Sequence, residues 1–144
     1  MGKRRKRRSS SLIPHLLLDT HIVLRWLGNA RQLSREQLRV IDHAAKRGEP
    51  VALSAITLVE IALIASGREP ALHVPLAEFL EDLNSNPAFR ILPITGEVAL
   101  EVAALGPLKD SADRIIAATA RVHRLKLVTS DQRIIDSGLV SVIE

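Results

Sequence analysis

The chain has 144 residues, of which 47% are hydrophobic, so we expect one domain with an aliphatic core. Only 2% are aromatic, which argues against aromatic surfaces on which single-stranded bases could stack. It contains no cysteine, which excludes disulfides, thiolate catalysis and cysteine-held zinc. The formal net charge is +4, and no apolar run approaches the ~20 residues of a membrane-spanning helix, so we expect a cytoplasmic protein that does not engage a membrane.

The chain begins with a strongly basic segment, and the remainder has slightly more acidic than basic residues. The six basic residues of this segment are Lys3, Arg4, Arg5, Lys6, Arg7 and Arg8. We predict that residues 1–13 form a disordered arm, which could attract the phosphates of RNA or be an extension without function. Residues 14–144 are then the folded domain.

Five short apolar segments predict β-strands. They do not alternate apolar and polar residues, which is typical of parallel strands covered on both faces. The predicted strands are 15–18, 50–53, 90–94, 126–129 and 140–143.

Longer segments between these strands have helical patterns. Ser34 and Ser54 are expected N-caps, and Pro75 is a good first-turn residue. The predicted helices are 20–27, 35–47, 55–66, 75–84, 97–105 and 111–124. The alternation of strands and helices predicts an α/β fold, a three-layer α/β/α domain with a central parallel sheet of about five strands.

Acidic residues follow three of the predicted strands. Asp19 follows the first strand, the helix carrying Glu60 follows the second, and Asp131 follows the fourth. Parallel sheets bind ligands outside the carboxyl ends of their strands, so these acids are expected at one edge of the sheet. A fourth acid, Asp113, lies at a helix start nearby.

Glu60 lies in a helix that is apolar on all sides, and such a helix is usually buried. A buried glutamate needs a cationic partner. We therefore expect Glu60 to hold either a metal ion or an arginine, for example Arg114.

The other acids also have structural interpretations. Asp110 and Asp113 are three residues apart at a helix start, as in a capping box with Asp110 as the cap. Asp19 could be a helix N-cap, and Asp131 could begin a turn or cap a short helix. A site is therefore indicated by the whole set of acids and not by any one of them.

Four converging carboxylates repel one another, and oxygen-only clusters suit hard cations such as Mg²⁺ or Mn²⁺. Such ions can activate water and stabilise the oxygens of a phosphodiester under attack. The histidines are scattered, and we expect surface or structural roles for His15, His21, His43, His73 and His123.

Four segments, "LLLDTHIVLRWL", "PVALSAITLVEIA", "DSADRIIAATA" and "LVTSDQRI", together resemble PIN-domain ribonucleases, in particular the VapC-like toxins of type II toxin–antitoxin modules. The resemblance covers about residues 15–144. It implies a Mg²⁺-dependent endoribonuclease (Mn²⁺ may substitute) that is a homodimer and has a cognate antitoxin. The acids that it implies for metal binding and catalysis are Asp19, Glu60, Asp113 and Asp131.

Other positions match the family less directly. Asp110 matches the first aspartate of a family string in which Ser111 here replaces proline. Thr20 and Ser130 match hydroxyl positions beside the metals, and Arg114 matches a position that we interpret as pairing with a buried acid.

Two alternative functions remain open at this point. One is a non-catalytic PIN-type module that binds RNA or protein. The other is a phosphoaspartyl enzyme with Asp19 as nucleophile, although His21 stands where such enzymes usually have a second aspartate.

Overall fold

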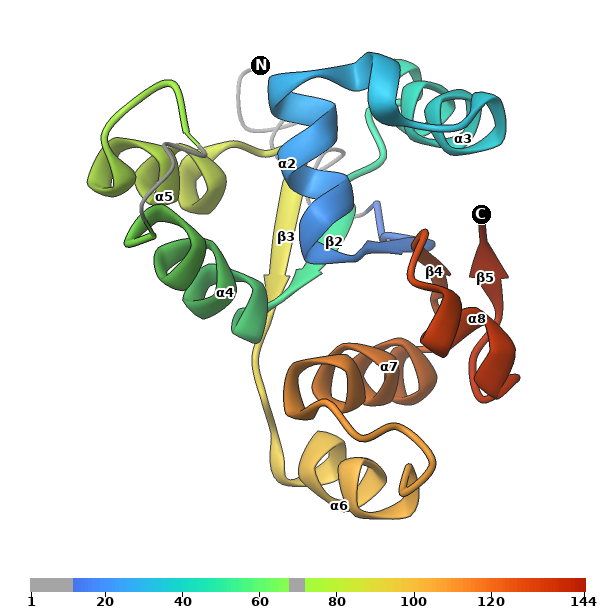
Figure 1. Cartoon of the computed structure of the whole chain (residues 1–144). Coiled ribbons are helices and arrows are strands. Elements are labelled where there is room, and N and C mark those ends of the chain that lie inside the picture. Colours follow the sequence, from blue (N-terminus) through green and yellow to red (C-terminus); the bar gives the residue numbers. More distant parts are fainter. Residues whose placement is uncertain (1–11, 68–71) are drawn as a thin grey trace.

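The computed structural model describes residues 12–67 and 72–144, in which five parallel strands form one sheet (Figure 1). The strand order is β3-β2-β1-β4-β5, with β1 at the centre. The strands are β1 Leu16–Leu18, β2 Val51–Ser54, β3 Phe89–Leu92, β4 Lys126–Val128 and β5 Val142–Ile143. The predicted parallel sheet is confirmed, and β3 ends before Pro93, which has no N–H group for a sheet hydrogen bond.

The helices at the predicted positions are confirmed to within about two residues, a usual uncertainty for helix ends. They are α2 Thr20–Gly28, α3 Arg35–Lys46, α4 Ala55–Ala65, α5 Leu76–Ser85, α6 Gly96–Ala104 and α7 Ser111–His123. Two short elements, η1 Ala30–Gln32 and α8 Gln132–Ser137, were not predicted as helices, because so few residues show no apolar periodicity.

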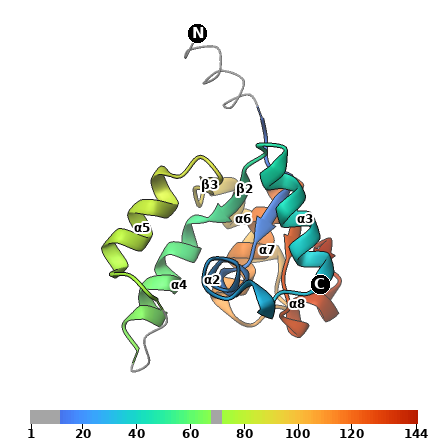
Figure 2. The same cartoon turned by 90° about the horizontal axis from the view of Figure 1, so that it is seen from above.

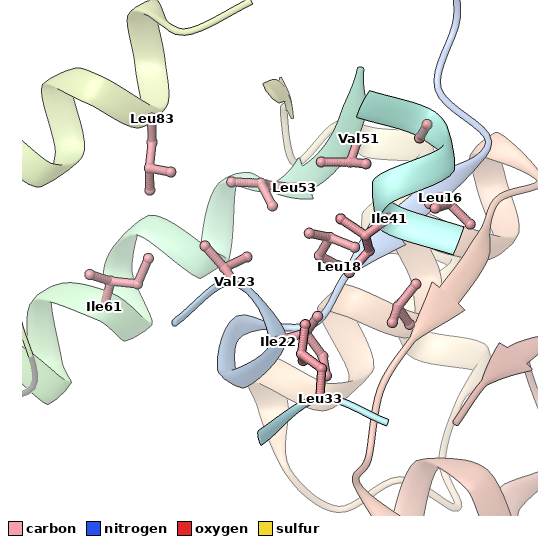
Figure 3. Close-up of a cluster of buried hydrophobic side chains, with 12 residues drawn as sticks. Leu16, Leu18, Ile22, Val23, Leu33, Ile41, Val51, Leu53, Ile61 and Leu83 are labelled. Atoms are coloured by element: carbon pink, nitrogen blue, oxygen red, sulfur yellow. The ribbon is translucent and has the colours of Figure 1, made fainter. Parts of the chain in front are cut away.

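The helices cover both faces of the sheet. On one face, Leu16 and Leu18 pack with buried residues of α2, α3, α4 and α5 (Figure 3). On the other face, Leu17 and Leu127 pack with α6, α7 and α8. Seen from above, α4 and α5 lie at one side of the molecule and α3 at the other (Figure 2). The predicted three-layer α/β/α arrangement is therefore confirmed.

Local sequence signals fix where these helices begin and end. Ser34 caps α3 in a full capping box with Gln37, and Ser54 caps α4, as predicted. Helix α3 is followed by Gly48, whose φ of +69° is unfavourable for other residues. Pro75 is the N-cap of α5 rather than its first residue.

Helix α4 is not buried on all sides, so the predicted burial of the helix that carries Glu60 is wrong. Ile61 lies in the core, but Val59, Leu63 and Ile64 are exposed, Leu63 to 67%. A sequence pattern that is apolar on all sides of a helix indicates burial. It does not show whether the residues that pack on the helix belong to the same chain or to another chain.

The predicted basic arm, residues 1–13, lies almost entirely outside the described residues, which begin at Leu12. Among the described helices, none has the length and apolar character needed to cross a membrane.

Candidate active site

Asp19 lies where β1 ends and α2 begins, and it is only 4% exposed. Its Oδ1 accepts a hydrogen bond from the backbone N–H of Thr20 at 2.8 Å, which confirms the N-cap interpretation. Its Oδ2 accepts a hydrogen bond from the hydroxyl of Thr129 at 2.6 Å. The carboxylate is therefore both a helix cap and a fixed group at the carboxyl edge of the sheet.

Thr20 connects this edge to Glu60 on α4. The Thr20 hydroxyl donates to Glu60 Oε1 at 2.5 Å and also lies 3.0 Å from the hydroxyl of Thr57. Burial raises the pKa of Glu60, the Thr20 hydrogen bond lowers it, and the nearby charges of Asp19 and Asp110 raise it further, so that the net direction is upward.

The arginine alternative for Glu60 is wrong in the described residues, and so is the pairing of Arg114 with an acid. Arg114 instead donates to the backbone carbonyls of Leu108 and Gly106. These carbonyls belong to the turn before α7, where the backbone has no regular hydrogen-bond partners. Glu60 has no basic partner within salt-bridge distance in the part of the chain that is described.

Asp110 and Asp113 form the start of α7. Oδ1 of Asp110 accepts from the backbone N–H of Asp113 at 3.0 Å, as the capping interpretation predicts. Asp113 is 9% exposed, and burial together with the charges of Asp131, Asp110 and Asp19 raises its pKa to about 7, against the lowering effect of Arg133. Ala117, Ala118 and Ala120, all fully buried, seat α7 against the sheet and so fix the position of Asp113.

Asp131 caps α8 and forms an ion pair with Arg133. Arg133 Nη2 lies 3.1 Å from Asp131 Oδ2 and 3.3 Å from Asp113 Oδ2. The hydrogen bond from Arg133 is the main cause of a lowered pKa of Asp131. We expected carboxylates without a counter-ion; Arg133, present in the "LVTSDQRI" segment, supplies one, although nothing in the sequence indicates where its side chain points.

His21, for which we expected a surface or structural role, lies inside the site. Its Nδ1 is 3.4 Å from Asp19 Oδ2, and its Nε2 accepts the backbone N–H of Ser130 at 3.0 Å. Burial lowers the pKa of His21 more than the charge of Asp19 raises it. A nitrogen that accepts a hydrogen bond carries no proton, so the Ser130 contact fits the neutral form of the ring.

The hydroxyl that contacts the acids after β4 belongs to Thr129 and not to Ser130. The Thr129 oxygen donates to Asp19 and accepts the backbone N–H of Asp131 at 3.0 Å. The Ser130 hydroxyl instead accepts from the Gln37 side chain at 2.9 Å. A threonine and a serine side by side have similar chemistry, so only the backbone direction at the strand end distinguishes them.

Hydrogen bonds and ion pairs connect the four acids into one group, but their side chains do not form a preorganised metal-binding site. In residues 12–67 and 72–144, no three histidine or acidic side chains are close enough to hold a metal ion. The donor chemistry nevertheless fits a hard divalent cation, because all donors are oxygens, and because burial, together with neighbouring negative charge, raises the pKa of both Glu60 and Asp113.

A family model described as the PIN domain matches residues 16–137. The chain belongs to the PIN-domain family. It is also 34% identical over 121 residues to Ribonuclease VapC22 of Mycobacterium tuberculosis, an alignment that covers 83% of this chain and 88% of that protein. The family resemblance of the four sequence segments is thus confirmed.

Solved structures extend the comparison of this PIN domain. The structure of FitAcB from Neisseria gonorrhoeae is similar with a TM-score of 0.66 at 29% identity, over 90% of this chain and 96% of the other. VapBC2 from Rickettsia felis, bound to a DNA fragment from its promoter, has a TM-score of 0.66 at 16% identity, over 92% and 98% of the two chains. The second likeness concerns the fold alone.

Proposed function

We propose that this PIN-domain protein is a metal-dependent endoribonuclease and the toxin of a type II toxin–antitoxin pair. The observation that carries this proposal is the connected group of Asp19, Glu60, Asp113 and Asp131 at the carboxyl edge of the sheet. The similarity to a protein named as a ribonuclease supports RNA as the substrate class.

In this proposal, Asp19, Glu60 and Asp113 hold the principal Mg²⁺ or Mn²⁺ ion, and Asp131 helps to hold a second. A cation held there would supply charge neutralisation for the phosphodiester and activation of a water molecule. The group of acids supplies the negative charge and the oxygen ligands that this chemistry requires.

The remaining residues of the site position these acids. Two hydrogen bonds fix Asp19, and the Thr20 hydroxyl fixes Glu60. Arg133 offsets part of the negative charge of Asp113 and Asp131 when no cation is present. Its side chain is 71% exposed, so it can move away without disrupting the core. Since the pKa of Asp113 is about 7, we expect cation binding to strengthen as the pH rises through 7.

The proposed partners are a cognate antitoxin and a second copy of the chain, both taken from the resemblance to VapC-like toxins. An acidic group of this kind suits an arginine from the antitoxin, because the guanidinium binds carboxylates through two parallel hydrogen bonds. The exposed apolar residues Val59, Leu63 and Ile64 of α4 support a surface that another chain covers.

The test is to incubate the purified protein with tRNA and rRNA in Mg²⁺, in Mn²⁺ and in EDTA, and to map the cut sites. We expect discrete cuts with either metal and none in EDTA. Binding of RNA without cutting in any metal would favour the non-catalytic module.

A covalent phosphate adduct on Asp19 would favour the phosphoaspartyl alternative. The geometry disfavours that chemistry, since both oxygens of Asp19 accept hydrogen bonds and the residue is almost completely buried.

A further inference from the structure

A basic pocket lies between α3 and the sheet, with a volume of about 490 Å³. Its charged and titratable basic lining residues are His15, Arg39, His43, Arg47, Arg124 and Lys126. We call this the basic pocket. Glu49 is the acidic residue among those that line it.

The basic pocket is at the edge of the sheet opposite to the acidic site. His15 precedes β1 and Lys126 begins β4, whereas Asp19 and Asp131 follow the ends of these same two strands. The strands are parallel, and four residues at about 3.3 Å per residue separate the two edges along β1 by ~13 Å. The two sites therefore carry opposite charge at opposite ends of the central strands.

Part of the positive charge in the basic pocket is neutralised and part is free. Arg39 pairs with Glu36, and Glu49 lies 3.0 Å from His15 and 3.8 Å from Arg47. Arg124 and Lys126 are exposed and have no acidic side chain within salt-bridge distance in residues 12–67 and 72–144. These two cations are available to an anionic ligand.

Arg124 occupies a backbone conformation that does not favour arginine. It is the C-cap of α7 with φ +56° and ψ +46°, in the left-handed region, where glycine or asparagine is usual. It is the one non-glycine residue with positive φ in the part of the chain that the structure describes. Helix termination therefore does not explain an arginine here, and an outlier of this kind is a reason to look for a functional role.

When no metal ion is bound, the acidic site of such a ribonuclease repels the phosphates of its own substrate. In that state, attraction comes from cations elsewhere on the surface. The basic pocket has the appropriate guanidinium and ammonium groups, and its lining has no tryptophan, tyrosine or phenylalanine on which a base could stack. These features suit phosphate groups rather than bases.

We propose that the basic pocket binds the phosphate backbone of single-stranded RNA at the edge of the sheet opposite to the acidic site. The choice of RNA rests on the proposed ribonuclease function. The contact is independent of base sequence and supplies affinity that the acidic site cannot.

The test measures binding of a labelled single-stranded RNA to the full chain by fluorescence anisotropy, in EDTA and over a series of salt concentrations. The pocket variant is Arg124→Asn with Lys126→Gln, where asparagine tolerates the left-handed backbone. The control variant is Arg31→Gln with Lys46→Gln, which also removes one exposed arginine and one exposed lysine, but outside the pocket. Thermal melts check that both variants are folded.

We expect the pocket variant to bind more weakly than the control and its salt dependence to be lower. Each contact to a single-strand phosphate contributes about 0.7 to the slope of log K against log salt, so the loss of two contacts should lower the slope by about 1.4. Equal affinities and slopes for the two variants would overturn the proposal.

A footprint on the wild-type chain identifies the ligand class. Single-stranded RNA should protect the Lys126 amine from acetylation and leave Lys46 reactive, as read by mass spectrometry. Equal protection of Lys126 by inorganic phosphate at the same phosphate concentration would make the pocket a small-anion site, and equal protection by polyglutamate would make it an acidic-protein site. Either result would overturn the assignment to RNA.

These measurements do not depend on cleavage. Specific RNA binding without any metal-dependent cutting would refute the proposed ribonuclease function alone. Metal-dependent cutting with equal binding by the pocket and control variants would refute this inference alone.

Discussion

Replacing Asp113 with asparagine should stabilise the metal-free protein, and the gain should grow with pH. Folding raises the pKa of this carboxyl from 3.8 to about 7. Well below pH 3.8, both the folded and unfolded states hold the proton, so ionisation costs nothing. Between about pH 4 and 7, the unfolded chain releases the proton while the folded chain keeps it, so the stability of the wild type falls.

The size of this effect follows from the same pKa values. One pKa unit corresponds to about 1.4 kcal/mol, so the ionised Asp113 costs the folded state at most about 4 kcal/mol above pH 7. We expect about 2 kcal/mol in practice, because solvent and rearrangement of the surrounding side chains stabilise the charge in part. Asparagine does not titrate and avoids this cost.

The assay is urea unfolding in EDTA at pH 4.5 and at pH 8, for the wild type, Asp113→Asn and the control Asp42→Asn. Asp42 is an exposed residue of α3 outside the site. Asp113→Asn should be more stable than the wild type by a small margin at pH 4.5 and by a clearly larger margin at pH 8, while the control shows no such change. A difference that is the same at both pH values, or a loss of stability at pH 8, would refute the explanation from crowded, buried charge.

Three further predictions concern other parts of the molecule. Arg133→Gln should increase the rise in melting temperature caused by Mg²⁺, because it removes the guanidinium next to Asp113 and Asp131; a rise equal to that of the wild type would show that Arg133 does not compete with the cation. Asp19→Asn should keep the helix cap but gain much less from Mg²⁺ in the same melts, and an equal gain would leave Asp19 as a cap alone. Deletion of residues 1–11 should leave the melting temperature unchanged, since the buried core begins at Leu16. It should lower the slope of log K against log salt for RNA binding by up to about 4, and an unchanged slope would give the basic segment no role in RNA binding.

The sheet and the main helices could be predicted because their signals are local. Apolar runs such as Leu16–Leu18 indicate strands covered on both faces, and caps such as Ser34 mark where helices start. The parallel order then brings the carboxyl ends of β1, β2 and β4 to one edge. The position of the acidic site follows from these features and needs no side-chain detail.

The contacts within the site could not be predicted because they depend on side-chain direction. Whether Thr129 or Ser130 faces Asp19, and whether Arg133 turns toward the acids, is set by the backbone at the end of β4 and by the start of α8. Helix α8 has only six residues, too few for a periodic pattern.

The exposure of α4 is unpredictable for a different reason. An apolar residue such as Leu63 has the same sequence signal whether its own chain or another chain covers it.

The ion pair expected between Arg114 and an acid is absent for a third reason. The backbone carbonyls of Gly106 and Leu108 are equally good acceptors for its guanidinium.

The central claim is that the four acids act together with a divalent cation to cut RNA. The most direct measurement compares RNA cleavage in Mg²⁺ by the wild type, by Asp113→Asn and by Asp42→Asn, after thermal melts have shown that all three are folded. We predict that Asp42→Asn cuts like the wild type and that Asp113→Asn loses cleavage, because a neutral amide does not supply the charge that the cation requires. Near-normal cleavage by a folded Asp113→Asn would contradict the claim.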